Sequence, residues 1–410
     1  MGYDVQKVRA DFPILAEMIN GKPLVYLDSA NSTQKPRHVI DAMTSFMSHS
    51  YAPVNRSSYR LAGESNDLYE GARASVRRFI NAPKVHEVVF TKNATEALNL
   101  VVQTWGRTNL GPDDVVVLTH MEHHANIVPW FQLQAEKGFE IRWVPLTADG
   151  QLDLTDLDRL LDGAKVFAFT AMSNVLGTTN DVAALSAAAR RAGAAVLVDA
   201  CQSIPHEPTD ISTWDVDFVA FSGHKMVGPT GIGGLWGRRE ILEAMPPFLG
   251  GGEMIRDVRK DGFTTNDVPW KFEAGTPAIA EAVGLGAAVT WLEGIGMDAI
   301  ADHERRLTAY ALERLTDALG DAITIYGPAT AEGRGSAISF LVDGIHAHDI
   351  SQVLDEDAVC VRAGHHCAKP LMRELGVPAT TRASLAVYND TDDVDALVEA
   401  LGKARAFFAL

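Results

Sequence analysis

Cysteine is scarce in this sequence. Only Cys201, Cys360 and Cys367 occur among 410 residues, and this odd, widely spaced set argues against a disulfide framework. A chain of this length can bury a full core without covalent cross-links. Free thiols are typical of a reducing compartment, so we expect the protein to be cytoplasmic.

Basic residues and long apolar runs are also scarce. The chain has 36 Lys and Arg against 53 Asp and Glu, a net charge of −17. This excess of acid repels phosphate backbones, so nucleic acid is not an expected partner. The first residues show no basic segment followed by an apolar stretch, and runs such as Ala194–Val198 are far shorter than the roughly 20 residues of a spanning helix. We therefore expect no membrane anchor, and a small molecule or another protein as partner.

An alternation of strand and helix patterns fills residues 85 to 245. Short β-branched runs are separated by alanine-rich stretches with helical spacing, which is typical of a mostly parallel sheet with crossover helices, the α/β class. Glycines between Gly223 and Gly252 are expected where the backbone turns tightly or approaches another group closely. Ligands gather at the carboxyl ends of such strands. The expected strands are Glu87–Thr91, Asp114–Thr119, Glu140–Pro145, Val166–Thr170, Ala195–Asp199 and Phe218–Ser222.

From about residue 291 the pattern changes to that of a smaller α+β domain. A long amphipathic helix is expected over Met297–Leu319 and a closing helix over Asp392–Ala406. Between them, strands are expected over Ile323–Tyr326, Ala337–Leu341 and Ala358–Arg362.

Two neighbouring strand ends present an acid and a lysine. Asp199 ends one expected strand, and Lys225 follows the next strand, 26 residues later. A lysine can form a Schiff base with an aldehyde, and a carboxylate against a pyridine nitrogen keeps that nitrogen protonated, which makes the ring an electron sink. The pair predicts a pyridoxal 5'-phosphate site, although each residue alone also fits an ordinary surface lysine or a capped aspartate.

A phosphate site is expected where a helix begins after Glu87–Thr91. Asn93, Ala94 and Thr95 open that helix, and its free N–H groups favour an anion. Ser222 and His224, beside the lysine, are candidate further contacts. A plain helix N-cap is the commoner use of such residues.

Histidines follow the strand Asp114–Thr119. An imidazole here, from His120, His123 or His124, could lie flat on the pyridine ring and shuttle protons. A metal site is the competing interpretation. Adjacent histidines point in different directions, and no cysteine or second acid stands at ligand spacing, so we expect no metal.

Cys367 lies in a glycine-containing loop among basic side chains. These side chains would favour its thiolate; they are Arg362, His365, His366 and Lys369. Cys360 and Cys201 fit the pattern of buried, inert cysteines instead. Arg382, a little later, has the forked guanidinium that suits an amino-acid carboxylate, or else forms a surface salt bridge.

Taken in order, these segments resemble the class V aminotransferase family of pyridoxal-phosphate enzymes, and within it the SUF-type, or group II, cysteine desulfurases. The resemblance implies transferase fold type I, with a mostly parallel seven-stranded sheet flanked by helices. It implies a large cofactor domain over residues 23–290, a small C-terminal α+β domain over 291–410, and an N-terminal segment, 1–22, packed on the small domain. The segments that carry the resemblance are 26–30, 122–126, 173–177, 222–225, 272–277, 362–367 and 382–385.

The resemblance also implies a role for each site residue. Lys225 would carry the cofactor as a Schiff base and Cys367 would be the nucleophile. The cofactor ring would contact Asp199 at its nitrogen, His123 on its face and Gln202 at its hydroxyl. The phosphate would contact Ala94, Thr95, Ser222, His224 and, across a homodimer interface, Thr276. The substrate would be held by Asn174 and Arg382, with Arg362 near the nucleophile.

The implied reaction converts L-cysteine to L-alanine, and the sulfur passes as a Cys367 persulfide to an acceptor protein of the SUF system for iron–sulfur cluster assembly. His123 is the candidate for the proton of the substrate thiol. Selenocysteine lyase, a class V aminotransferase or epimerase, and a non-catalytic scaffold remain alternatives, and none of these requires Cys367.

Two segments depart from the family pattern. Val54–Tyr59 stands where a histidine, an arginine, a small residue and a second histidine are usual, and Asn31 stands where a small residue is usual. Both segments line the substrate entrance in relatives, so we expect substrate access or the acceptor side to differ.

Overall fold

A seven-stranded sheet forms the centre of the computed structural model, which describes residues 3–55 and 57–408. Four of its strand pairings are parallel, while β10 is antiparallel to both of its neighbours. The fold class is therefore α/β, as expected. In spatial order the strands are β4 (Val88–Thr91), β10 (Gly233–Gly237), β9 (Phe218–Ser222), β8 (Ala195–Asp199), β7 (Ala164–Thr170), β5 (Val115–Thr119) and β6 (Glu140–Val144).

All six strands expected in this region are present, and β10 is the seventh strand that the resemblance implies, at a place that the apolar pattern does not predict. Its glycines indicate only a turn or a close approach, and the structure shows a close approach inside the sheet. A side chain on Gly234 would overlap the ring of Phe221, and one on Gly233 would lie 2.6 Å from the main-chain oxygen of Phe221. The glycines thus let β10 lie flat against β9.

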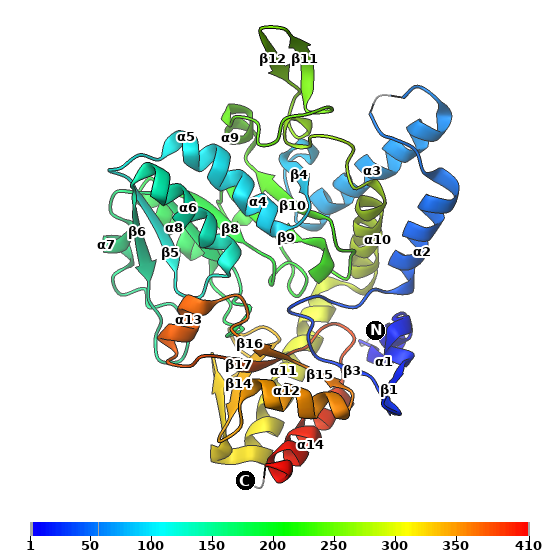
Figure 1. Ribbon diagram of the computed structural model, residues 1–410, viewed down its shortest axis with the longest axis vertical. Coiled ribbons are helices and arrows are strands. Elements are labelled where there is room, and N and C mark those ends of the chain that lie inside the picture. The colour runs from blue at the N-terminus through cyan, green and yellow to red at the C-terminus, as the bar shows by residue number, and fades with distance from the viewer. Residues whose placement is uncertain (1–2, 56, 409–410) are drawn as a thin grey trace.

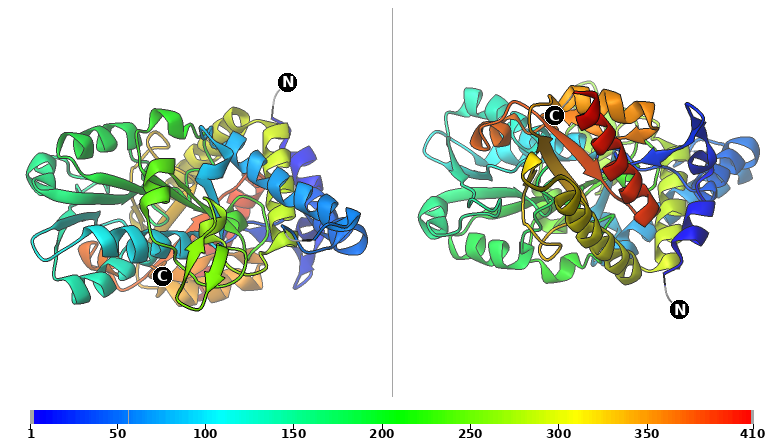
Figure 2. Two further views of the ribbon diagram at one scale, coloured as in Figure 1. Left: turned by 90° about the horizontal axis from the view of Figure 1, so that it is seen from above. Right: turned by 90° about the horizontal axis from the view of Figure 1, so that it is seen from below.

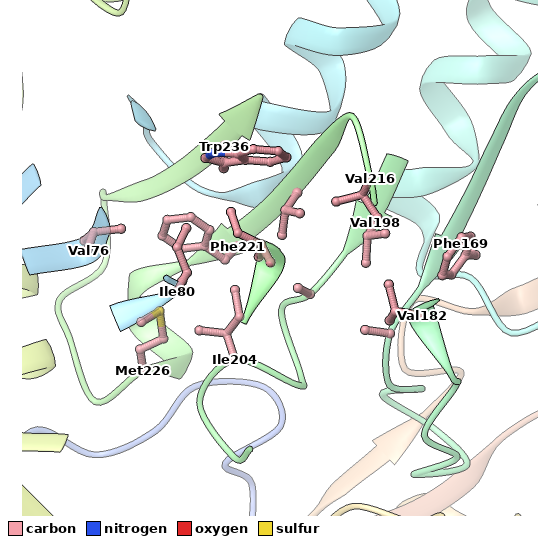
Figure 3. Close-up of a cluster of buried hydrophobic side chains, with 14 of the residues drawn as sticks. Val76, Ile80, Phe169, Val182, Val198, Ile204, Val216, Phe221, Met226 and Trp236 are labelled. Carbon is pink, nitrogen blue, oxygen red and sulfur yellow. The ribbon is translucent and has the colours of Figure 1, made fainter. Parts of the chain in front are cut away.

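The alternation of side chains along each strand builds two apolar layers. Val198 and Phe221 point into one cluster, which Figure 3 shows, while Leu197 and Ala220 point into the other. Successive strand residues face opposite sides of a sheet, so both faces are apolar and both are covered. Each fully buried Val or Phe side chain contributes about 1.5–3 kcal/mol.

Helices cover both faces of the sheet, as the view from above in Figure 2 shows. The first cluster is covered by α3 (Arg60–Phe79), α8 (Val182–Arg191) and α10 (Ile279–Ile295), and the second by α4 (Ala94–Val101) and α6 (Val128–Lys137). Further α-helices of this part are α2 (Arg37–Ser45), α5 (Arg107–Asn109), α7 (Leu157–Leu161) and α9 (Arg239–Ala244), and the hairpin β11 (Ile255–Arg259) and β12 (Gly262–Thr265) projects from it (Figure 1).

A four-stranded antiparallel sheet organises the C-terminal part. Its order is β13 (Ile323–Tyr326), β14 (Ala337–Val342), β17 (Thr380–Ser384) and β16 (Arg362–Gly364). Helices α11 (Met297–Leu319) and α14 (Thr391–Phe407) pack side by side on it (Figure 2). This part also contains the α-helices α12 (Ala347–Glu356) and α13 (Lys369–Glu374). The bounds of α11 agree with the expectation from sequence.

The expected strand Ala358–Arg362 is divided between two sheets. Its first half, β15 (Val359–Cys360), pairs in parallel with β3 (Val25–Tyr26), and its second half continues as β16. The chain thus passes from the pair with β3 into the four-stranded sheet. The loop that carries Cys367 follows directly after β16.

The N-terminal segment lies against the C-terminal part of the chain. From α1 (Val5–Ala10) Arg9 donates to the carbonyl of Tyr388 at 2.7 Å, and Gln6 donates to Asp390 at 2.9 Å. The short strands β1 (Met18–Ile19) and β2 (Lys22–Pro23) follow. The domain boundaries themselves stay a prediction.

Among residues 3–55 and 57–408, no single helix is long and apolar enough to span a bilayer. The helices α10 and α11, which are joined at a bend, meet the criteria of length and apolarity only when they are taken together.

Candidate active site

A cavity of about 180 Å³ lies at the carboxyl ends of β7, β8 and β9, where the loops of the small domain meet the large sheet. Thr170, Asp199 and Ser222, the last residues of these strands, all line it. This is the position at which ligands bind in parallel α/β sheets. All of the predicted site residues except Thr276 line this cavity.

Asp199 and Lys225 face the cavity from adjacent strand ends. The buried Asp199 accepts a hydrogen bond at Oδ1 from the Cys201 N–H at 3.0 Å, which fixes its carboxylate. Lys225 is half-buried in a 3₁₀ turn that follows β9. Gln202, predicted to meet a ring hydroxyl, lines the cavity and donates to the carbonyl of Ala30 at 2.8 Å.

The start of α4 forms the end of the cavity suited to an anion. Asn93 caps the helix by accepting the Glu96 N–H at 3.0 Å, and Ser222 Oγ accepts the Ala94 N–H at 2.9 Å. A side chain on Gly233 would lie 2.7 Å from the Cα of Asn93, so only glycine lets β10 lie this close. Among the first N–H groups of α4, that of Thr95 has no partner among the described hydrogen bonds, and a free N–H at a helix start suits a phosphate. Together with the carboxylate and the lysine, this donor set fits pyridoxal phosphate.

His123 is held in one tautomer. Its Nδ1 accepts the Ala125 N–H at 3.1 Å, so the neutral ring carries its proton on Nε2. Burial first, and then the charges of Lys225, His124, Arg362 and Arg382, lower the pKa of His123 to about 3. The ring is therefore neutral near pH 7 and can donate from Nε2. It can take up a proton only if Nδ1 releases the Ala125 N–H.

The loop that carries Cys367 is held in a strained conformation by several hydrogen bonds. His366 and Cys367 have positive φ angles of 49° and 56°, which residues other than glycine seldom adopt and which cost energy. Asn174 Nδ2 donates to the carbonyl of His366 at 2.8 Å, and the His124 N–H donates to the carbonyl of Cys367 at 2.7 Å. Within the loop, the Cys367 N–H donates to His365 Nδ1 at 3.1 Å. Both main-chain polar groups of Cys367 are therefore bonded, and the large domain fixes the strained backbone.

Cys367 differs from the other two cysteines in its surroundings. Arg362 Nη2 lies 3.7 Å from Cys367 Sγ, within hydrogen-bond reach of sulfur. Cys201 also lines the cavity, but burial and then the charge of Asp199 raise the pKa of its thiol. Burial likewise raises the pKa of Cys360. The inert character expected of these two cysteines therefore has a physical cause.

His366 does not supply the positive charge expected of it. The ring is buried and hydrogen-bonded at Nε2 to Thr380. Burial first, and then the charges of Arg382 and Arg362, lower its pKa to about 2. The expectation that His366 would favour a thiolate was wrong, because the sequence does not show that this imidazole is buried and bonded to Thr380 of β17.

Arg382 is fully buried between the two domains. Its Nη1 donates to the carbonyl of Asn174 at 2.8 Å and its Nη2 to Asp28 Oδ1 at 3.2 Å. Burial lowers its pKa to about 10, so the guanidinium stays charged near pH 7. The alternative interpretation, a surface salt bridge, does not describe this residue.

Comparison with known proteins agrees with this geometry. The family model for class-V aminotransferases matches residues 25–397. A probable cysteine desulfurase of Streptomyces coelicolor is 50% identical over 99% of this chain and 98% of its own length. The chain belongs to the class-V aminotransferase family.

Two solved structures have the same fold as this chain. A cysteine desulfurase of Escherichia coli, solved as an S-sulfonic acid, has a TM-score of 0.90 and 39% identity, and the match covers 99% of this chain and 100% of that one. The cysteine desulfurase of Thermococcus onnurineus, in its apo form, has a TM-score of 0.92 and 36% identity over 97% of each chain. The predicted family, fold type, cofactor and desulfurase activity are confirmed. The SUF subgroup stays a prediction.

Thr276 is the predicted site residue that the class-V fold does not bring into the cavity. Its side chain is exposed in a separate hollow that also contains Leu249 and Glu281. Sequence reasoning placed Thr276 in the site of a second copy of the chain, and its position here leaves that prediction open.

Sequence reasoning missed two contacts at the rim of the cavity. Asp28 pairs with Arg382, and Asn31 Oδ1 accepts a hydrogen bond from Arg362 Nη1 at 2.8 Å. Both contacts join positions more than 300 residues apart, so no local spacing could reveal them. The only signal was that Asn31 departs from the family pattern. The other departure, Val54–Tyr59, includes Arg56, which lies outside the described residues.

Proposed function

We propose that this chain is a SUF-type cysteine desulfurase that transfers sulfur from L-cysteine to Cys367 and then to an acceptor protein for iron–sulfur cluster assembly. One observation carries the proposal: Cys367 lines the same cavity as Lys225 and Asp199, with Arg362 Nη2 3.7 Å from its sulfur. A transaminase or an epimerase has no use for a thiol at that place. The names of the relatives support the same activity.

Each part of the cavity would hold one part of the cofactor. Asp199 would pair with the ring nitrogen, His123 would cover the ring face and Gln202 would meet the ring hydroxyl. When bound, pyridoxal phosphate supplies an aldehyde that bonds amines and a protonated ring that stabilises negative charge at the α-carbon of an attached amino acid. The phosphate would be held by Ala94, Thr95, Ser222 and His224.

The substrate is oriented by residues of both domains. The guanidinium of Arg382 and the side chain of Asn174 would hold its carboxylate, since a buried fork of donors suits a carboxylate. Lys225 Nζ, once free, would take the α-proton. His123 would take the proton of the substrate thiol, at Nδ1, after the bond from the Ala125 N–H has opened.

The sulfur transfer then balances without an external oxidant. Cys367, as thiolate, attacks the substrate sulfur, so an S–S bond forms while the substrate C–S bond breaks. The electron pair of the C–S bond stays on the carbon, which is protonated to become the methyl group of L-alanine. The products are L-alanine and a persulfide on Cys367.

The decisive experiment compares the native enzyme with Cys367→Ala, incubated with L-cysteine and a thiol reductant. We expect sulfide and alanine from the native enzyme in equal amounts, and almost none from the variant. Cys360→Ala is the matched control, because Cys360 is a free cysteine of the same domain that does not line the cavity, and it should retain native activity. Equal sulfide from Cys367→Ala and native enzyme would overturn the proposal.

The same variant separates the rival activities. Selenium leaves more readily than sulfur and needs no protein thiol, so a Cys367→Ala variant that makes alanine from selenocysteine alone would show that the site also acts as a selenocysteine lyase. Full retention of a transamination or racemisation activity in that variant would favour an aminotransferase or epimerase.

We also propose a cytoplasmic homodimer with two shared sites. The exposed position of Thr276, away from Lys225 of its own chain, supports this arrangement. Sedimentation should then give twice the chain mass, and Thr276→Val should weaken the retention of pyridoxal phosphate on dialysis. A monomer that keeps its cofactor and its activity would overturn this part of the proposal.

The acceptor protein is tested by adding purified candidates to the desulfurase. A zinc-bearing scaffold-like protein and a different sulfur carrier are the two candidate types. The proposed acceptor should raise the rate of alanine formation from L-cysteine and should itself become persulfidated. No change with either type would count against the SUF assignment.

A further inference from the structure

Asn31 connects two arginines of the cavity through a chain of hydrogen bonds. Its Oδ1 accepts from Arg362 Nη1 at 2.8 Å, and its Nδ2 donates to Asp28 Oδ2 at 3.1 Å. Asp28 in turn accepts from Arg382 at 3.2 Å. Both polar atoms of the Asn31 amide are therefore used, and these bonds fix the orientation of the amide.

The guanidinium of Arg362 is shared between Asn31 and Cys367. Nη1 donates to Asn31, while Nη2 lies 3.7 Å from Cys367 Sγ. An arginine side chain has many rotamers, and a hydrogen bond to sulfur is weak. A second, shorter bond to a fixed acceptor is what keeps the planar fork pointed at the thiol.

The chemistry of the amide suits this task. An amide oxygen accepts the N–H of Arg362 without neutralising its charge, whereas a carboxylate at this position would compensate the positive charge that faces the sulfur. A small residue, which is usual here in the family pattern, would leave Nη1 to water.

We propose that Asn31 is a positioning residue that holds the Arg362 guanidinium against Cys367 and so favours the thiolate that receives sulfur. The inference deepens the proposed function and rests on Cys367 as the sulfur acceptor. Asn31 acts through Arg362 and has no contact of its own with the sulfur among the described hydrogen bonds of this cavity.

Other charged and titratable groups also face Cys367, so the effect of Asn31 must be separated from theirs. The strand β17 contributes Arg382, the loop itself contributes His365 and His366, and Lys369 follows it. From the large domain, His123, Asp199, His224 and Lys225 line the same cavity, and the His124 N–H donates to the Cys367 carbonyl. All of these stay unchanged when only Asn31 and Arg362 are varied.

The test measures the alkylation of Cys367 by iodoacetamide in the holoenzyme, without substrate, from pH 5 to pH 9. The Cys367 peptide is quantified by mass spectrometry, so the other two cysteines need no change. The variants are Asn31→Ala, Arg362→Ala and the double variant. Asn109→Ala is the matched control, because the side chain of this exposed asparagine also makes a hydrogen bond, to the carbonyl of Trp105, away from the cavity.

For Asn31→Ala we expect the midpoint of alkylation to move to higher pH by about half a unit and the rate at pH 7 to fall about threefold, the effect of losing one modest hydrogen bond. Arg362→Ala should show a larger shift. In a protein that already carries Arg362→Ala, the further change Asn31→Ala should not alter the alkylation of Cys367, because Asn31 acts on Cys367 only through the Arg362 guanidinium.

Turnover supplies a second readout. Asn31→Ala should lower kcat for alanine formation from L-cysteine by a similar factor and leave KM unchanged. A native alkylation profile in Asn31→Ala, or an equal slowing with and without Arg362, would overturn the inference. So would a rise in KM alone, which would mean that Asn31 contacts the substrate.

The alkylation profile is independent of turnover, so the two proposals fail separately. If Cys367→Ala produced sulfide at the native rate, the proposed function would fall while the alkylation result stood. If Cys367→Ala were inactive and the Asn31→Ala profile were native, only the positioning role of Asn31 would fall.

Discussion

Asn174 and His366 lie 192 residues apart and are joined by a 2.8 Å hydrogen bond from the Asn174 side-chain nitrogen to the His366 carbonyl. The bond connects the large domain to the strained loop that carries Cys367. The loop follows a strand of the small domain, so its position over the cavity depends on contacts of this kind. Asn174 therefore holds the loop, in addition to the role at the substrate carboxylate that is proposed for it.

Replacement of Asn174 by Ala should loosen the Cys367 loop. A hydrogen bond of this type contributes about 0.5–1.5 kcal/mol, so kcat for alanine formation from L-cysteine should fall roughly three- to tenfold. Hydrogen exchange in residues 364–368 should become faster. Gln134→Ala is the matched control, because the Gln134 amide also donates to a main-chain carbonyl, that of Phe139, at 2.9 Å. Native exchange in the loop of Asn174→Ala would contradict the prediction.

Replacement of Arg382 by Lys should weaken substrate binding. Lysine keeps the charge but cannot reach Asp28, the Asn174 carbonyl and a carboxylate together, because it lacks the planar fork. Hydrogen bonds to charged groups contribute about 1.5–3 kcal/mol, so KM for L-cysteine should rise roughly ten- to hundredfold. Arg142→Lys, at a partly exposed arginine paired with Glu140, should leave KM unchanged. Equal KM values for native and Arg382→Lys enzyme would show that Arg382 has only a structural role.

The sequence predicts the parts of the fold that depend on local periodicity. The strand β9 and the helix α11 have the bounds expected from their apolar spacing, because burial on a sheet face or a helix stripe imposes that spacing. The strand β10 was missed because its glycines are required by neighbours, the ring and carbonyl of Phe221, and no local pattern shows where those neighbours lie.

In the site, too, some positions follow from local sequence patterns and others depend on contacts between distant parts of the chain. Lys225 and Asp199 stand at the ends of adjacent strands of the seven-stranded sheet, so their convergence follows from the α/β topology. Cys367 follows a strand of the C-terminal sheet instead, and its place over the cavity depends on contacts such as the bond from Asn174 to His366. The pairing of Arg382 with Asp28, the bond from Arg362 to Asn31 and the inward turn of His366 are tertiary contacts. They depend on how the small domain packs on the large one, which periodicity does not determine.

Glu122 should make the stability of the protein depend on pH. The residue is fully buried and accepts hydrogen bonds from Thr119, Asn126 and the Thr170 N–H. Burial raises its pKa from 4.5 to about 8, against the lowering effect of these bonds. The folded state thus keeps a proton that the unfolded chain releases above pH 4.5. The associated stability is present below that pH and is lost as the pH rises toward the folded-state pKa, by at most about 1.4 kcal/mol per pH unit.

Glu122→Gln removes this proton and keeps a side chain of the same shape. Urea denaturation from pH 5 to pH 8.5 should show the native protein losing stability relative to the variant as the pH rises, with the difference levelling off above pH 8. Subtracting one curve from the other cancels the titration of all other groups. A difference that does not change with pH would mean that Glu122 is ionised in the folded protein throughout this range.

The variant Gly233→Ala tests whether the phosphate end of the cavity depends on the close packing of β10 against the start of α4. In Gly233→Ala the new methyl group would lie 2.6 Å from the carbonyl oxygen of Phe221 and 2.7 Å from the Cα of Asn93. Both are main-chain atoms, one in β9 and one at the start of α4, and neither can move aside without shifting its element, so the fold should lose about 1–3 kcal/mol. The start of α4 carries the N–H groups proposed for the phosphate, and the variant should therefore also lose pyridoxal phosphate faster on dialysis, as measured by its visible absorbance.

Gly71→Ala is the matched control, since Gly71 lies inside the helix α3 and no described neighbour lies within 4 Å of the added methyl group. Alanine is the better helix former, so this variant should gain roughly 0.5–1 kcal/mol and keep its cofactor. Thermal unfolding of the two variants should therefore shift in opposite directions. If Gly233→Ala lost stability but retained the cofactor as the native enzyme does, β10 would matter for folding alone, and the phosphate would have to be held by groups other than the start of α4.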